Sequence, residues 1–260
     1  MADTIQKTGK NKDGQFFAEI IENIKLSDDT YRIALYSEKI SNNAKPGQFV
    51  SVLCGNLTLR RPFSIASVNN ETFSIIYKVK GQGTDYISKL SIGANVDLIG
   101  PIGKGFNIEN KKSLLIGAGV GIAPMIFLSQ ILKDKGIFHY ILAGFRNYID
   151  IKELNNENAS LITEDGASGN RGFINDYVEE LIIRNKIEKI YTCGPVPVMK
   201  FAVDMAIKYN LDIETALEKE FACGIGVCMG CSIDYREDDI VVNKRICKDG
   251  PVFNGRNVVW

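Results

Sequence analysis

The spacing of the cysteines restricts this chain more than any other feature of its sequence. Three of the six cysteines fall within nine residues, at positions 223, 228 and 231, and a fourth stands at position 247. Glycines lie between the first three, and glycine adopts backbone turns that other residues resist. A C-x4-C-x2-C run with a fourth cysteine elsewhere is the spacing of thiolates that ligate a two-iron cluster. We therefore predict that a [2Fe–2S] cluster is bound by Cys223, Cys228, Cys231 and Cys247.

A zinc site or a set of free thiols is the alternative explanation of these cysteines. Structural zinc usually takes two C-x2-C pairs, or cysteines together with histidines. Here Cys247 stands alone, and the only histidine, His139, lies far away in a segment typical of a strand. Paired disulfides are not expected, because the N-terminus carries no apolar export signal. The chain is predicted to be cytoplasmic.

Charge and hydropathy argue against several classes of partner. The formal net charge is zero, so nothing favours nucleic acid or an anionic membrane, and we predict neither as a partner. Residues 113–132 carry no charge over a length that could span a membrane. Three glycines and Pro124 interrupt this stretch, however, which favours a buried strand, a tight turn and the start of a helix.

The pattern of strands and helices changes along the chain. Residues 1–14 are expected to form a disordered tail. Residues 15–107 contain short alternating strands and turns, which are typical of a small antiparallel β-barrel. Residues 108–216 alternate strands with helices, which indicates parallel βαβ units. With residues 217–260, the sequence predicts an α+β multidomain protein: an antiparallel barrel, an α/β parallel-sheet nucleotide domain and a small C-terminal [2Fe–2S] unit.

The run Arg61-Pro62-Phe63-Ser64 in the barrel segment has the chemistry of a flavin site. An arginine can pair bidentately with a pyrophosphate, and the serine offers a hydroxyl and a backbone donor near a flavin ring edge. The run resembles the flavin-binding signature of the ferredoxin–NADP reductase superfamily. Taken singly, it is also an ordinary piece of strand. Two further segments match the superfamily in the same order, and the resemblance assigns them to FAD as well: Ile76, Tyr77 and Lys78, then Gly83 and Thr84 in a G-x-G-T turn that opens a helix, where Thr84 is also a suitable N-cap.

A glycine-rich turn follows the first strand of the predicted nucleotide domain. It departs from the dinucleotide fingerprint, because Ile122 stands where the third glycine belongs. It matches the turn of the same superfamily, in which small residues let a pyrophosphate approach the backbone. The resemblance assigns these residues to NAD: Gly117, Gly119, Gly121 and Pro124.

A later strand ends in Cys193-Gly194-Pro195, which in the superfamily lies beside the nicotinamide. We predict that Cys193 lies near the hydride path as a catalytic-site residue, although a buried free cysteine is the ordinary interpretation. The sequence leaves NAD and NADP open, because the fingerprint acid about twenty residues beyond the glycines is absent. Arg146 suits a 2′-phosphate, whereas Glu164-Asp165-Gly166 suits a ribose.

Taken together, these motifs resemble, over residues 15 to 253, the electron-transfer subunit of the dihydroorotate dehydrogenase B type. The resemblance implies FAD, a [2Fe–2S] cluster and NAD as cofactors. It implies a heterotetramer with a catalytic, FMN-containing dihydroorotate dehydrogenase subunit, whose electrons reach NAD+ through the cluster and FAD in pyrimidine biosynthesis. A flavin belongs between cluster and nicotinamide, because it exchanges either one electron or two. Glu164 departs from the family, in which aspartate is usual.

Other assignments stay open. Small subunits of NADH-dependent ferredoxin–NADP reductase and of sulfide dehydrogenase share these cofactor motifs, and a fold does not determine the partner. A redox-inactive binding module belongs to a different class, and the four cysteines argue against it. For Trp260 we expect a packing or solvent-facing role, because the iron–sulfur extension separates it from the flavin motifs.

Overall fold

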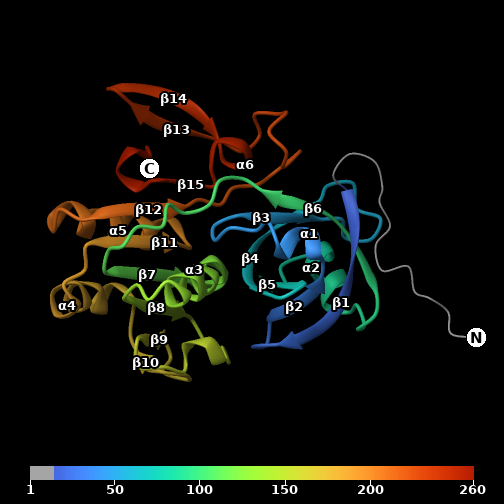
Figure 1. Cartoon of the computed structure of the whole chain (residues 1–260), viewed down its shortest axis with the longest axis horizontal. Coiled ribbons are helices and arrows are strands. Elements are labelled where there is room, and N and C mark those ends of the chain that lie inside the picture. The colour runs from blue at the N-terminus through green and yellow to red at the C-terminus, as the bar shows by residue number, and fades with distance from the viewer. Residues whose placement is uncertain (1–14) are drawn as a thin grey trace, which may run out of the picture.

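The computed structural model describes residues 15–260, so the predicted tail of residues 1–14 lies outside the described residues. The described chain has three parts (Figure 1). A barrel and a sheet flanked by helices lie side by side, and a C-terminal segment with a hairpin lies across one side of both.

The first part is a closed barrel with the strand order β1-β2-β5-β4-β3-β6, and each strand pairs antiparallel with its neighbours. The predicted antiparallel barrel is therefore confirmed. Alternate side chains of the strands fill its interior, among them Ile20, Leu35 and Ile65. The bounds are β1 (Gln15–Lys25), β2 (Thr30–Tyr36), α1 (Glu38–Ser41), β3 (Phe49–Val52), β4 (Arg61–Asn69), β5 (Thr72–Lys78), α2 (Gln82–Ser88) and β6 (Asn95–Ile102).

The second part is a sheet with the strand order β10-β9-β8-β7-β11-β12-β15, parallel throughout except for the last pair. Its central strand β7 is buried on both faces and reads as a continuous apolar run, as central parallel strands do. Helix α3 packs on one face, and α4 and α5 pack on the other. The predicted α/β fold is therefore confirmed. The bounds are β7 (Ser113–Ala118), α3 (Ile122–Asp134), β8 (His139–Phe145), β9 (Ala159–Thr163), β10 (Asn170–Arg171), α4 (Asn175–Asn185), β11 (Lys189–Cys193), α5 (Val196–Lys208) and β12 (Asp212–Ala216), with one-turn 3-10 segments at Gly119–Gly121 and Lys152–Leu154.

The C-terminal segment is joined to that sheet rather than standing apart from it. Strand β15 pairs antiparallel with β12, with Phe253 opposite Thr215, and so crosses the predicted boundary at residue 217. A lone two-stranded hairpin is only marginally stable, and an added strand covers the open edge of the sheet. The bounds are β13 (Ser232–Glu237), β14 (Ile240–Arg245), α6 (Ile246–Asp249) and β15 (Val252–Asn254), with a 3-10 turn at Gly255–Asn257.

Helix α3 connects the barrel to the sheet. Its Phe127 is buried among the core residues of the barrel. The Gln130 side chain of α3 forms two hydrogen bonds with the backbone of Val68 in β4. Its Nε2 donates to the Val68 carbonyl oxygen (2.6 Å), and its Oε1 accepts from the Val68 N–H (3.3 Å). The uncharged residues 113–132 are thus a strand, a turn and a helix, and none of the helices in the described part is long and apolar enough to cross a membrane.

Candidate functional site

A cavity of about 420 Å³ lies where the barrel, the carboxyl ends of β11 and β12, and the C-terminal segment meet. In open α/β sheets, ligands bind outside the carboxyl ends of the strands, so this is the position of a ligand site. The barrel and α2 contribute Gly47, Phe49, Arg61, Pro62, Phe63, Ser64, Ile76, Tyr77, Lys78, Lys80, Gly81, Gln82, Gly83 and Thr84. The rest of the chain contributes Val120, Cys193, Ala216, Leu217, Glu218, Lys219, Phe221 and Pro251.

The residues predicted to contact FAD all lie in this wall. Strand β4 pairs with β3 so that Arg61 is opposite Val52 and Ser64 is opposite Phe49. On β5, the Tyr77 ring meets the Phe63 ring edge-on, with 5.6 Å between the ring centroids. The first two predicted FAD segments, far apart in sequence, therefore meet through an aromatic contact beside the cavity.

Two neighbouring arginines differ in what they contact. Arg60 donates to Asp97 Oδ1 (2.9 Å) and to the carbonyl oxygens of Asp97 (3.2 Å) and Ser51 (3.4 Å), so it holds barrel strands together. Arg61 instead lines the cavity. A Cβ atom on Gly83 would lie 3.3 Å from Arg61 Nε, so glycine leaves room for that guanidinium. Arg61 is thus the arginine that the fold offers to a bound anion.

Helix α2 begins differently from one of the sequence interpretations. Gly81 is its N-cap, and Thr84 is the third helical residue rather than the cap. Thr84 Oγ1 accepts from the backbone N–H groups of Lys80 (2.9 Å) and Gly81 (3.2 Å). The hydroxyl is therefore occupied in closing the turn, because the N-cap glycine has no side chain to do so. Thr84 shapes this wall of the cavity by holding the turn.

The glycine turn predicted for NAD lies beside the cavity. Gly119 has φ +56°, in the left-handed region, and a Cβ atom on Gly121 would overlap the Cys193 carbonyl oxygen. Glycine therefore lets the turn approach the end of β11, and Val120 and Cys193 reach the cavity wall. The remaining residues predicted for the nucleotide are not in this wall: Gly117, Gly119, Gly121, Pro124, Gly194 and Pro195.

Cys193 faces a carboxylate that the sequence analysis did not identify. Its Sγ lies 4.0 Å from Glu218 Oε1, and the residue is 1% exposed. Burial raises the pKa of the Cys193 thiol well above its usual value, and the charge of Glu218 raises it further. Burial also raises the pKa of Glu218, which lines the cavity. The thiol is therefore neutral at pH 7, which excludes a thiolate nucleophile.

Two residues that no sequence motif indicates extend the wall toward the cysteines. The rings of Phe49 and Phe221 pack with centroids 5.2 Å apart, and Phe221 is followed two positions later by Cys223. These two residues, Glu218 and Phe221, both come just after the carboxyl end of β12. A strand assigned to residues 212–216 would have been the signal for them, because ligand sites lie at such ends.

The four predicted cluster cysteines converge as two pairs. The sulfur atoms of Cys223 and Cys228 lie 3.2 Å apart, and those of Cys231 and Cys247 lie 3.3 Å apart. Within residues 15–260, no group of three or more His, Cys, Asp or Glu residues is placed to hold one metal ion. A four-thiolate zinc site needs such a group, whereas a [2Fe–2S] cluster divides four thiolates between two irons. The donor set fits the two-iron cluster.

The loop around the first pair favours thiolate. The Cys228 N–H donates to Cys223 Sγ (3.4 Å). Burial acts to raise the pKa of Cys223, but the backbone N–H groups of Cys228, Ile225 and Val227 outweigh it and lower the pKa to about 6. Burial and the neighbouring Cys231 raise the pKa of Cys247 to about 12. Backbone donors directed at sulfur are the environment that iron–sulfur ligation uses.

Proteins of known name are similar to almost the whole chain. The chain is 35% identical over 247 residues to the "Dihydroorotate dehydrogenase B (NAD(+)), electron transfer subunit" of Caldanaerobacter subterraneus subsp. tengcongensis. The aligned region covers 94% of this chain and 98% of the relative. The chain is 33% identical over 248 residues to the protein of the same name from Clostridium acetobutylicum, covering 93% of this chain and 96% of the relative.

A family model and a solved structure extend these findings. Residues 218–259 match the "Iron-sulfur cluster binding domain of dihydroorotate dehydrogenase B", which confirms the predicted C-terminal unit. The chain is also similar to a structure described as "Insights into flavin-based electron bifurcation via the NADH-dependent reduced ferredoxin-NADP oxidoreductase structure". That match has a TM-score of 0.83 and 28% identity, and covers 94% of this chain and 90% of the other. On the identity and coverage of its curated relatives, the chain belongs to the family of electron transfer subunits of dihydroorotate dehydrogenase B.

Proposed function

We propose that this chain carries electrons between a catalytic dihydroorotate dehydrogenase subunit and NAD+ in pyrimidine biosynthesis, with FAD and a [2Fe–2S] cluster as its cofactors. One observation supports this most strongly: a single cavity has all the predicted FAD residues in its wall and reaches a residue beside each of the other two predicted sites. Its wall contains the FAD residues, Cys193 from the nucleotide side and Phe221 next to the cysteine loop. Bound FAD supplies hydride exchange with nicotinamide and single-electron exchange with a cluster, and so belongs between them.

The cavity wall has an apolar part and a cationic part, as a flavin dinucleotide requires. Phe49, Pro62 and Phe63 offer apolar surface to a ring system. Arg61 and Lys80 offer positive charge to a diphosphate, and Arg61 can do so bidentately. These residues would bind and orient FAD, and Ser64, Ile76, Tyr77, Lys78, Gly83 and Thr84 complete the wall.

We assign the nucleotide to the carboxyl end of β7 and β11. The turn that contains Gly117, Gly119 and Gly121, with Pro124, would receive the diphosphate, and Gly194 and Pro195 would border the nicotinamide. Cys193 and Glu218 lie where that ring would meet the flavin, with the Cys193 Sγ 4.0 Å from Glu218 Oε1. The relatives are named for NAD+, so we propose NAD rather than NADP.

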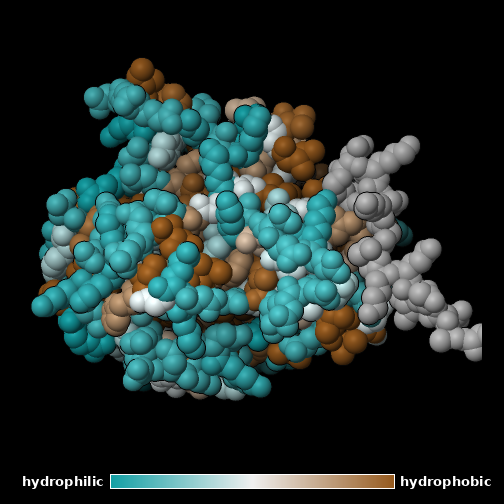
Figure 2. All heavy atoms as spheres, in the orientation of Figure 1, coloured by the Kyte–Doolittle hydropathy of each residue, from teal (hydrophilic) through white to brown (hydrophobic). Residues whose placement is uncertain are grey.

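We propose that the catalytic subunit binds over the cysteine loop and the β13–β14 hairpin. Figure 2 shows apolar atoms near the free end of the hairpin and, separated from these by hydrophilic atoms, over the neighbouring loop. Exposed apolar patches of this kind mark interaction surfaces. The loop places the partner beside the cluster, and two copies of each subunit would form the heterotetramer. The exposed apolar residues are Ile225, Val227, Met229, Ile240 and Val241.

The parts of the chain divide this work between them. In this proposal residues 15–107 bind FAD, residues 108–216 bind NAD, and residues 217–260 bind the cluster. Cytoplasm is the proposed location, since no disulfide joins any two of the six cysteines, as is usual in a reducing compartment.

The test is reconstitution with the partner. The chain is co-expressed with an FMN-containing dihydroorotate dehydrogenase subunit and purified anaerobically, and NADH formation from dihydroorotate and NAD+ is followed at the nicotinamide absorbance. We expect NADH only from the complex. Replacing Cys231→Ser should abolish it and leave the partner able to reduce an artificial dye. A complex that contains both cofactors yet forms no NADH would contradict the proposal.

A second function is favoured by the structural similarity to the NADH-dependent ferredoxin–NADP oxidoreductase. In that case the same cofactors would serve a different partner. The complex would then exchange electrons between NADH and ferredoxin and show no dependence on dihydroorotate. Measuring dihydroorotate-dependent NADH formation and NADH-dependent ferredoxin reduction on the same preparation distinguishes the two functions.

A further inference from the structure

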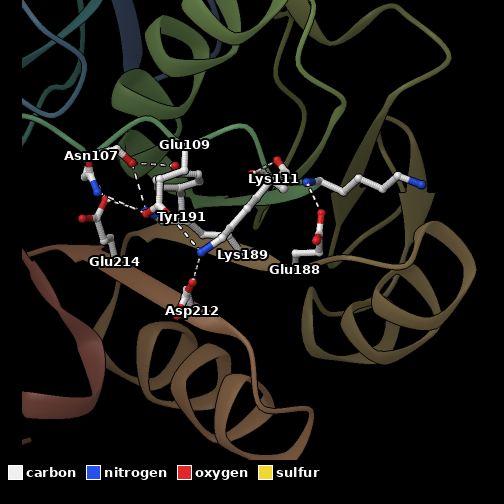
Figure 3. Close-up of polar contacts among 10 residues, drawn as sticks. Asn107, Glu109, Lys111, Glu188, Lys189, Tyr191, Asp212 and Glu214 are labelled. Carbon is white, nitrogen blue, oxygen red and sulfur yellow. Dashed lines mark hydrogen bonds and ion pairs between the residues drawn. The ribbon is translucent and has the colours of Figure 1, made fainter.

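At the end of β11 opposite the cavity, a lysine is buried among polar groups. Lys189 is only 2% exposed. Its Nζ donates to Glu109 Oε1 (2.6 Å) and to the Asn107 carbonyl oxygen (2.9 Å), and lies 3.6 Å from Glu214 Oε2. Figure 3 shows these side chains converging from three segments of the chain. None of these groups takes part in binding FAD, NAD or the cluster as proposed above.

Two of these groups belong to the connection between barrel and sheet, residues 103–112, which we call the linker. The Tyr191 hydroxyl donates to the Asn107 carbonyl oxygen (2.8 Å). The Asn107 N–H donates in turn to Glu214 Oε2 (2.9 Å). The middle of the linker is therefore bonded to β11 and to β12 at once.

The end of the linker is held at the same place. Lys111 Nζ lies 2.7 Å from Glu109 Oε2 and 2.5 Å from Asp212 Oδ2. The Lys112 N–H donates to Glu188 Oε2 (2.9 Å). Hydrogen bonds from Lys111 and Lys189 lower the pKa of Glu109 to about 2, so this carboxylate is charged at pH 7. If the linker moved, the buried Lys189 ammonium would lose its partners, which is unfavourable inside a protein.

The start of the linker contacts the segment that carries the cluster. The Lys104 N–H donates to the Gly250 carbonyl oxygen (2.6 Å), and the Phe106 N–H donates to the Pro46 carbonyl oxygen of the barrel (2.8 Å). Gly250 directly follows α6, the helix that holds Cys247, and the next residue, Pro251, lines the cavity. Residues 103–106 are thus bonded both to the barrel and to the cluster-bearing segment.

We propose that Lys189 is a positioning residue for electron transfer between flavin and cluster. Lys189 holds the linker at Asn107 and Glu109. The linker in turn holds Gly250 through the Lys104 N–H, and Gly250 follows the helix that carries Cys247. Lys189 therefore fixes the position of the Cys231–Cys247 pair relative to the cavity. The inference rests on the proposed function. The contacts of Lys189 should not affect the rate of hydride exchange, because Cys193 lies at the opposite end of β11 and strand pairing within the barrel holds the FAD residues.

The test follows the two half-reactions separately in the complete chain, loaded with FAD and cluster. NADH is mixed anaerobically with the loaded chain, and the absorbance of flavin and of cluster is recorded by stopped flow. Cluster reduction is checked by electron paramagnetic resonance. Bound FAD would accept hydride from NADH, and a bound [2Fe–2S] cluster would accept the electrons from it one at a time. In Lys189→Met we expect flavin reduction at an unchanged rate and cluster reduction slowed by up to roughly a hundredfold, since misplacement on the order of 1 Å can have effects of this size.

Two further variants sharpen the result. Lys189→Arg keeps the charge and should restore most of the cluster rate. Lys112→Met removes a neighbouring lysine that enters the network through its backbone N–H, and should leave both rates unchanged. If K189M does not fold, Glu109→Gln replaces it with the same pattern expected at smaller amplitude. The inference is overturned if cluster reduction is normal in the folded variant, or if both rates fall together. A wild-type chain without flavin contradicts the proposed function and this inference with it.

Discussion

The two ends of strand β11 bury polar groups in opposite ways. At its start, the Lys189 ammonium is 2% exposed and is matched by carboxylates. At its end, the Cys193 thiol is 1% exposed and is held neutral, next to a carboxyl group whose pKa burial has raised. Paired charges hold one geometry, because separation leaves a charge uncompensated. A neutral thiol and an acid whose ionisation burial disfavours hold no fixed ion pair in the cavity wall.

The difference extends to the acids at the two ends. Hydrogen bonds from two lysines lower the pKa of Glu109 to about 2, whereas burial raises the pKa of Glu218. Acidification therefore removes a favourable charge from one end and an unfavourable charge from the other. The same strand connects the Lys189 network to a candidate reaction site, and Glu109 and Glu218 respond to pH with opposite sign, while burial also raises the pKa of Glu214 beside Lys189.

Removing the buried charge should have the largest effect on stability. Lys189→Met leaves Glu109 and Glu214 facing the linker without their buried cation. Breaking a buried ion pair by removing one partner costs about 3–5 kcal/mol. We expect a loss of this order in the free energy of unfolding, measured by denaturant titration. Lys112→Met is the matched control and should change it by less than about 0.5 kcal/mol. A K189M variant as stable as the control would show that the anchor is not needed.

The opposite end should respond to added volume rather than to lost charge. In Gly121→Ala, the new methyl group would overlap the Cys193 carbonyl oxygen, so the turn or the end of β11 has to shift. Overpacking of this kind costs about 1–3 kcal/mol. Because the shift occurs beside Cys193, we also expect slower flavin reduction by NADH, measured by stopped flow. Unchanged stability and rate would mean that the turn relaxes freely and that its close approach is unimportant.

How much of this could be predicted depended on whether a feature is local in sequence. The succession of strands and helices and the cysteine spacing are patterns that can be read along the chain, and they predict the barrel, the sheet and the iron–sulfur unit that the structure and the relatives bear out. The pairing of Lys189 with Glu109 spans 80 residues, and that of Cys193 with Glu218 spans 25. In sequence, Lys189 and Glu218 look like ordinary surface charges. Only the pairing of β7, β11 and β12 brings them to their partners.

A smaller effect is expected from Glu109, and it should depend on pH. Its pKa is lowered in the folded state, so its stabilising contribution is present above the unfolded value of 4.5 and is lost as the pH falls toward about 2. The side chain is 32% exposed, and solvent screening reduces the contribution to roughly 1 kcal/mol. Glu109→Gln should therefore be less stable than wild type at pH 7, and the difference should vanish near pH 2. A pH-independent difference in thermal unfolding would contradict an ionic origin.

The smallest effect, of opposite sign, is expected from Glu218 at the cavity. Because its folded pKa is raised, folding favours the protonated acid, and wild type loses stability relative to a neutral variant as the pH rises above 4.5. The carboxylate is open to the cavity, so screening limits the effect to less than about 1 kcal/mol. Glu218→Gln should unfold at a slightly higher temperature than wild type at pH 7 and at the same temperature near pH 4. A variant less stable than wild type at pH 7 would show that the ionised carboxylate has a favourable partner, and the contrast between the two ends of β11 would no longer hold.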